Sequence, residues 1–166
     1  MERLWAPWRL TYVTSAAGGD PKQCIFCAAL HPRHPSPLIV FRGELVFVIL
    51  NKFPYSNGHL MVVPTRHVGR MAESAPDELH ELIALTRTAE MALTEAYQAH
   101  GLNVGMNLGR SAGAGVLDHL HIHVVPRWDG DTNFMTAVGG TRVVPEDPEQ
   151  SVARLTPIFE RLVGSA

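Results

Sequence analysis

The stretch from His119 to Val125 restricts the possible folds of this chain more than any other part of the sequence. It runs His-Leu-His-Ile-His-Val-Val, so histidine and aliphatic residues alternate strictly. Side chains of a β-strand point alternately to the two faces of a sheet, so this pattern predicts a strand with three imidazoles on one face. A histidine-rich surface strand or a site for a metal alone also has this pattern. Three neighbouring imidazoles can, however, divide catalysis between a nucleophile, a fixed ligand and a hydrogen-bond donor, which favours an active site.

A glycine-rich loop comes immediately before this strand. Gly109, Gly113 and Gly115 lie in it, and their backbone N–H groups can converge on an anion without obstruction by side chains. Taken alone, such glycines indicate a plain turn, but beside the histidines they predict a phosphate cradle. A neutral imidazole is a good nucleophile toward phosphorus. The loop and the strand together therefore favour nucleotidyl transfer through a nucleotidyl-histidine intermediate.

The other apolar patterns predict an α+β fold. Residues 38–64 are expected to form an antiparallel meander, and residues 102–109 a strand before the glycine loop. A long helix with a capping box of Ser74 and Asp77 is expected to end at Gly101. Its apolar face is predicted to contain Leu79, Leu82, Ile83, Leu93 and Tyr97. A C-terminal helix is predicted from the spacing of Val152, Leu155, Phe159 and Leu162. The expected architecture is a mostly antiparallel sheet with one long central helix and a C-terminal helix.

Length and composition limit the classes of function. The 166 residues predict a single domain over residues 1–166, in which residues 1–23 form an arm anchored by Trp5 and Trp8. A net charge of −2 argues against nucleic-acid binding through a general basic excess. The longest apolar run, residues 45–50, is too short to cross a bilayer, and the N-terminus lacks the apolar core of a signal peptide. A cytoplasmic protein without nucleic-acid or membrane partners is therefore expected.

The two cysteines of the chain, Cys24 and Cys27, have the spacing of a zinc knuckle. A structural zinc needs two more ligands, and the sequence offers a nearby pair of histidines and a distant pair: His31 with His34, and His67 with His119. A metal-free reduced pair is a third possibility. A redox pair is disfavoured because no thioredoxin-like βαβ pattern surrounds the cysteines.

Several segments together resemble the histidine triad family of nucleotide hydrolases and transferases. Residues 119–125 match the family motif His-Φ-His-Φ-His-Φ-Φ, in which Φ is an apolar residue. Three further segments follow the family's order: LNKFPYSNGHLMVVPTRH, NLGRSAGAG and VPRWDGDTNFM. The resemblance covers nearly the whole chain. It implies the family's α+β fold and a homodimer.

The resemblance also implies the catalytic residues. The central histidine of the triad, His121, is the implied nucleophile. His123 is implied to bind the attacked phosphate, and His59 is similar to the family histidine that helps to polarise it. Asp118 lies beside the triad but alternates to the opposite face, so it is not expected to take part.

Nucleotide binding is implied for a second set of residues. Asn51 resembles the residue that holds the ribose hydroxyls, and Asn107 matches a polar position on the phosphate side. Many members have Ser or Gln-Ser directly before the triad, where this chain has Gly115 and Val116. The departure favours backbone amides, including those of Gly113 and Gly115, as the phosphate donors. Candidates for an apolar base slot, which are equally good core residues, are Phe47, Ile49 and Phe53.

The resemblance is greatest to the bacterial diadenosine tetraphosphate phosphorylase branch, through the segments LWAPWR, CIFC and PRWDGDTNFM. It implies structural zinc held by the cysteines with His67 and His119, and phosphorolysis with inorganic phosphate as co-substrate. Candidate phosphate ligands in this chain are Lys52, Arg110, Ser111 and Arg127. Ala114-Gly115 replaces the branch's usual Gly-Ser, so hydrolysis of dinucleoside polyphosphates or nucleoside phosphoramidates stays an alternative. A zinc-stabilised nucleotide-binding sensor is the alternative from another class.

Overall fold

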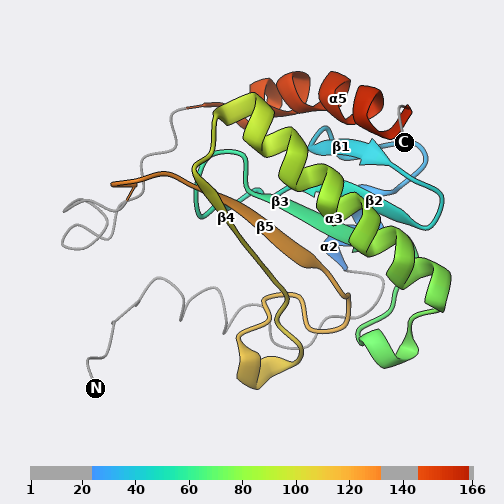
Figure 1. Cartoon of the computed structure of the whole chain (residues 1–166). Coiled ribbons are helices and arrows are strands. Elements are labelled where there is room, and N and C mark those ends of the chain that lie inside the picture. Colours follow the sequence, from blue (N-terminus) through green and yellow to red (C-terminus); the bar gives the residue numbers. More distant parts are fainter. Residues whose placement is uncertain (1–23, 132–145, 165–166) are drawn as a thin grey trace, which may run out of the picture.

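The computed structural model describes residues 24–131 and 146–164, which form a five-stranded antiparallel sheet with helices on both faces (Figure 1). The strand order is β1-β2-β3-β5-β4. The strands are β1 (Ile39–Arg42), β2 (Val46–Leu50), β3 (Leu60–Pro64), β4 (Gly101–Gly105) and β5 (Ile122–Arg127). Every neighbouring pair is antiparallel, which confirms the predicted meander and the α+β class. The predicted arm, with Trp5 and Trp8, lies outside the described residues.

The helices differ greatly in length. They are α2 (Ile25–Ala29), α3 (Pro76–Tyr97) and α5 (Pro148–Gly164), with the 3-10 turns η2 (Met71–Glu73) and η3 (Arg110–Ala112). Figure 1 shows α3 and α5 next to each other on one face of the sheet and α2 on the opposite side. The predicted long and C-terminal helices are thereby confirmed. No helix of the described part of the chain is long and apolar enough to span a membrane.

The two faces of the sheet carry different cores. β2 and β3 are buried along their whole length, so alternate residues of each strand enter opposite cores. The side chains that these two strands direct toward α3 and α5 are all aliphatic, for example Val48, Leu60 and Val62. Toward α2 the core contains Phe47, Ile49, Met61 and Val63 together with Cys24, Phe26 and Ala29. The second core is the one beside which the histidines gather.

The start of α3 differs from the prediction by one residue. Pro76 occupies the first helical position, which makes Ala75 the N-cap instead of Ser74. Glu78 rather than Asp77 then reaches back, and its carboxylate accepts the Ala75 N–H at 2.7 Å. The same buried carboxylate pairs with Arg66, which lowers the pKa of Glu78.

The end and the buried face of α3 also correct the prediction. The helix ends at Tyr97 rather than at Gly101, because Gln98 adopts the left-handed conformation with φ of 51°. Gly101 instead begins β4. Ile83 is 59% exposed and does not belong to the core face, whereas Leu82 and Leu93 do.

Candidate functional site

A continuous row of rings runs beside the α2 face of the sheet. In order, the row contains His67, His119, Phe26, His121, His123 and His59. The centroids of neighbouring rings are 4.8 to 5.3 Å apart. The three triad imidazoles thus lie on one side, while Leu120, Ile122 and Val124 enter the core beneath α3. The predicted alternation is confirmed, although the ladder of β5 begins only at Ile122.

The first end of this row is a group of potential metal ligands, which we call the metal corner: Cys24, Cys27, His67 and His119. Their four ligand atoms all lie within 4.8 Å of one another. The Cys24 Sγ atom is 3.3 Å from His119 Nδ1, and the Cys27 Sγ atom is 3.3 Å from His67 Nδ1 and 3.7 Å from His119 Nδ1. Tetrahedral zinc with ordinary bond lengths places sulfur and nitrogen ligands about 3.6 Å apart. The four residues therefore fit a metal ion.

A hydrogen bond to the main chain prepares His119 for such a role. Its Nε2–H donates to the Pro64 carbonyl at 2.8 Å, so Nδ1 carries the lone pair and faces the thiols. Burial lowers the pKa of His119 to about 4, which keeps the imidazole neutral. Burial and the neighbouring Cys24 raise the pKa of Cys27 to about 11. A cation bound there would reverse this preference, because metal ligation requires the thiolate.

The alternative local pair of histidines lies elsewhere. His31 and His34 are exposed on the loop after α2, and their rings stack on each other at 5.9 Å. Neither belongs to the group of four, which is the only cluster of potential ligands found among the described residues.

We call the other end of the row, His121, His123 and His59, the reactive end. His121 is 5% exposed, and its Nδ1–H donates to the backbone carbonyl of His119 at 2.8 Å. This bond leaves the lone pair on Nε2. Burial lowers the pKa of His121, which favours the neutral imidazole. A neutral imidazole with one nitrogen fixed by a carbonyl has the form that a histidine nucleophile needs.

A backbone N–H determines which nitrogens of His59 and His123 carry hydrogen. The Tyr55 N–H donates to His59 Nδ1 at 3.1 Å, so the hydrogen of a neutral His59 is on Nε2. His59 Nε2 lies 2.9 Å from His123 Nδ1, which must then accept. The hydrogen of His123 is consequently on its Nε2. This side chain can donate to negative charge that develops on a substrate.

The loop between β2 and β3 brings His59 to this position. Gly58 has φ of +73°, and a Cβ atom there would lie 2.8 Å from the ring of Tyr97 in α3, so only glycine fits. Asn51 begins the same loop, and its Oδ1 accepts the Phe53 N–H at 2.9 Å. The Asn51 Nδ2 atom lies 3.4 Å from His59 Nδ1, which places this predicted ribose ligand at the reactive end.

The other predicted nucleotide-binding residues lie in different surroundings. Phe47 and Ile49 are buried in the core beside α2, at 1% and 6% exposure, whereas Phe53 is 66% exposed. Asn107 is half-buried in the segment after β4. The glycine loop forms η3, and Gly109 and Gly113 on either side of it have φ of 84° and 83°.

One of the predicted phosphate ligands, Arg127, is held by other side chains. Arg127 pairs with Asp131 and donates to Asn103 Oδ1 at 2.7 Å, which holds its guanidinium at the far end of β5. Arg110 and Ser111 are exposed on η3. Lys52 places its ammonium 5.9 Å from the ring of Phe53.

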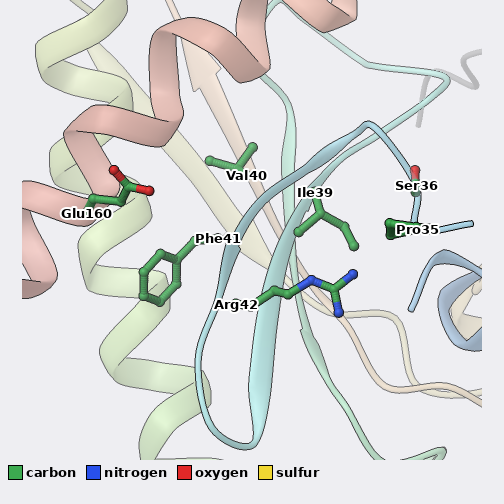
Figure 2. Close-up of a pocket in the computed structure, with 7 residues that line it drawn as sticks. All are labelled: Pro35, Ser36, Ile39, Val40, Phe41, Arg42 and Glu160. Carbon is green, nitrogen blue, oxygen red and sulfur yellow. The ribbon is translucent and has the colours of Figure 1, made fainter. Parts of the chain in front are cut away.

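Two shallow hollows lie apart from the row of rings. One is bordered by β1 and α5, with Phe41, Arg42 and Glu160 among its lining residues (Figure 2). The other lies between η2 and the glycine loop, and Arg110 and the exposed Asp118 line it. Neither hollow is lined by a histidine or cysteine.

Sequence reasoning did not identify every residue on which this site depends. The predicted site omits Phe26, whose ring belongs to the row, and Tyr55 and Pro64, which supply backbone hydrogen bonds to it. Phe26 lies between the candidate metal ligands Cys24 and Cys27 in the sequence, and this position could have indicated that its side chain lies near the site. The contributions of Tyr55 and Pro64 come from backbone groups, whose hydrogen-bond partners cannot be predicted from a single sequence.

Comparison with known proteins agrees with this geometry. A family model, HIT domain, matches residues 34–130, which is more than half of the chain. The protein therefore belongs to the histidine triad, or HIT, family.

Several relatives have names that state an activity, and two of them name dinucleoside tetraphosphates. The AP-4-A phosphorylase of Mycobacterium tuberculosis is 43% identical over 152 residues, covering 88% of this chain and 78% of the relative. The asymmetrical bis(5'-nucleosyl)-tetraphosphatase of Schizosaccharomyces pombe is 31% identical over 93 residues, covering 56% of this chain and 50% of the relative. Among solved structures, a zinc-bound histidine triad family protein from Mycobacterium smegmatis is similar, with a TM-score of 0.71 and 28% identity. That similarity covers 87% of this chain and 99% of the other.

Proposed function

We propose that this enzyme transfers a nucleotidyl group from a dinucleoside polyphosphate to an acceptor through a covalent intermediate on His121. The observation that carries the proposal is the buried His121, whose Nδ1–H donates to the His119 carbonyl and whose Nε2 keeps its lone pair. The relatives named above act on dinucleoside tetraphosphates, which supports this class of substrate.

The chemistry proceeds in two displacements at one phosphorus atom. In the first, His121 Nε2 attacks the α-phosphorus of diadenosine tetraphosphate, the N–P bond forms, and the P–O bond to the leaving ATP breaks. In the second, the acceptor attacks the same phosphorus and releases the neutral imidazole of His121. ATP is a stable polyphosphate anion, so its departure needs no carboxylic acid in the site.

The remaining residues of the site bind the substrate and stabilise the charge on the attacked phosphate. His123 donates from Nε2 to the oxygens of the attacked phosphate, and His59 holds it in the required tautomer. Asn51 and Asn107 contact the ribose and phosphate, and the amides of Gly113 and Gly115 complete the phosphate cradle. Phe47 and Ile49 support the base from the core beside α2.

Inorganic phosphate is the proposed acceptor, which makes the overall reaction the formation of ADP and ATP. Bulk water is present at about 55 M, so phosphate wins only if a built anion site raises its effective molarity, which can reach ~10⁵ M or more. The glycine-loop amides with Arg110 and Ser111 are the candidate parts of that site. Similarity to a relative named AP-4-A phosphorylase favours this acceptor, and similarity to the named tetraphosphatase makes water the second candidate.

Structural zinc at the metal corner belongs to the same proposal. When bound, the ion would hold α2 against the segment that leads into β5 and would stabilise the fold without joining the reaction. The geometry of the four ligand atoms and the zinc-bound M. smegmatis neighbour support it. The resemblance to the family further supports a cytoplasmic homodimer that binds neither nucleic acid nor membrane.

The product set tests the reaction. The enzyme is incubated with diadenosine tetraphosphate over a range of phosphate concentrations, and nucleotides are separated by anion exchange. We expect ADP and ATP in equal amounts at a rate that rises with phosphate. AMP and ATP at a phosphate-independent rate would make water the acceptor. Binding without turnover would point to the sensor class.

A further inference from the structure

We propose that Phe26 is a positioning residue for His121 and that it links the occupancy of the metal corner to the orientation of the nucleophile. The inference rests on the proposed function of His121. It adds a second connection between the two ends of the ring row, besides the main chain between His119 and His121.

Phe26 lies between the two ends of the row. Its side chain is 1% exposed, and its ring centroid is 5.3 Å from that of His119 and 5.1 Å from that of His121. The planes of the Phe26 and His121 rings meet at 49°, and those of His121 and His123 at 81°. His121 is therefore enclosed between an inert ring on one side and a hydrogen-bonding ring on the other.

One hydrogen bond does not fix the plane of an imidazole. The bond from His121 Nδ1 to the His119 carbonyl holds one nitrogen, but the second side-chain torsion of histidine has a broad energy minimum. The direction of the Nε2 lone pair depends on that torsion. The ring of Phe26, which lies against His121 and belongs to the buried core beside α2, restricts this torsion because a packed interior resists the tilting of a ring.

The position of Phe26 in turn depends on the cysteines. It belongs to α2, a helix of only five residues, whose N-cap Cys24 makes no side-chain cap hydrogen bond. A helix this short is not stable by itself and needs tertiary anchors. Cys24 and Cys27 lie on either side of Ile25 and Phe26, so a metal ion held by both cysteines would fix the backbone that carries the Phe26 ring.

The consequence is a specific kinetic signature. A nucleophile that is misdirected but still present lowers the rate of the chemical step, whereas substrate affinity is set by contacts elsewhere. We expect Phe26→Leu, which keeps an apolar side chain but removes the ring, to lower kcat about tenfold and to leave KM within about twofold. Unchanged kcat would overturn the proposal, as would a rise in KM alone.

Phe159→Leu is the matched control. Phe159 is fully buried in the core on the α3 and α5 face and belongs to neither end of the row. The substitution is chemically identical and removes the same volume from a core. It should lower the melting temperature to a similar extent and leave kcat unchanged; an equal loss of kcat would show that destabilisation alone explains the result at Phe26.

Nitrogen-15 NMR of the His121 ring gives a readout that does not require turnover. In the wild type we expect a single tautomer with hydrogen on Nδ1. Chelation of the metal and Phe26→Leu should each shift and broaden the His121 ring signals, because the ring gains freedom to tilt about its second side-chain torsion. Chelation of the Phe26→Leu protein should add little more. A His121 signal that is unaffected by both would contradict the proposal. If the wild type turns over no dinucleotide but shows these changes, the function fails and the positioning role stands.

Discussion

His119 and His121 stand two residues apart on the same side of the sheet, yet the structure prepares them for opposite tasks. A carbonyl takes the Nε2–H of His119 and leaves Nδ1 facing two thiols. A carbonyl takes the Nδ1–H of His121 and leaves the lone pair on Nε2. The comparison teaches that the roles of these two histidines are decided by which of their nitrogens bonds to a main-chain carbonyl.

The two ends of the row differ in the same way as these two residues. At the metal corner, both imidazoles direct Nδ1 at sulfur, the arrangement of a closed and structural metal site. At the reactive end, imidazoles bond to one another and to backbone groups. Substitutions at the reactive end should therefore change the rate of the reaction without changing metal content. Substitutions at the metal corner should primarily remove the metal.

The largest effect on turnover is expected for His121→Ala. Loss of the covalent nucleophile should lower kcat at least about a thousandfold, a barrier increase of at least ~4 kcal/mol. Nucleotide binding measured by calorimetry should be largely retained, and the metal content should be unchanged. More than about one part in a thousand of wild-type kcat in this variant would exclude the covalent role.

Cys27→Ala should have the next largest effect, on metal content and stability. Near-stoichiometric zinc in the wild-type protein, measured by elemental analysis without added metal, should fall close to zero. If free zinc is about a thousandfold above the Kd, its loss removes roughly 4 kcal/mol and lowers Tm by about 8 to 16 °C. His67→Ala should also lose the metal.

His31→Ala and His34→Ala are the matched controls for the metal corner, because both histidines are exposed and lie just after α2. Both variants should keep the metal. Loss of zinc from either of them, with zinc retained in His67→Ala, would transfer the site to the local pair.

The sequence was sufficient to predict those features that depend on side-chain alternation. Strict alternation from residue 119 predicted the shared imidazole face, and strands of regular spacing predicted the meander. The start of α3 was misplaced because Ser74 is a better N-cap residue than Ala75, yet Pro76 determines where the helix begins. Ile83 was misassigned because the buried stripe passes through Leu82 and Leu85 instead.

What could not be predicted is the set of backbone contacts that chooses between tautomers. The Tyr55 N–H reaches His59 through the conformation of the loop before β3, and the Pro64 carbonyl reaches His119 across 55 residues of the sequence. Every residue except proline has the same backbone groups. A pattern of side chains therefore gives no information about which backbone group meets which ring nitrogen.

A moderate effect, on substrate binding alone, is expected for Asn51→Ala. The change removes the side chain at the predicted ribose position and its bond to the Phe53 N–H. KM for diadenosine tetraphosphate should rise about 5- to 20-fold, which corresponds to roughly 1 to 2 kcal/mol. Zinc content should be that of the wild type. A fall in kcat with unchanged KM would assign Asn51 to the chemical step instead.

The smallest effect is expected for Asp118→Asn. Asp118 precedes the triad directly but is exposed and lines the hollow beside η2, outside the row of rings. Steady-state kcat and KM should both stay within about twofold of the wild-type values, since surface substitutions outside such sites have small effects. A tenfold loss of kcat would show that the Asp118 carboxylate takes part in the reaction.

The central claim, that His121 forms a covalent bond to the nucleotide, is tested most directly by trapping the intermediate. The enzyme is mixed with diadenosine tetraphosphate without inorganic phosphate, quenched within milliseconds under alkaline conditions that preserve phosphorus–nitrogen bonds, digested and sequenced by mass spectrometry. We predict an adenylyl group on the peptide that contains His121, and localised to that residue. An adduct on His123 or His59, or burst release of ATP without any adduct, would contradict the account.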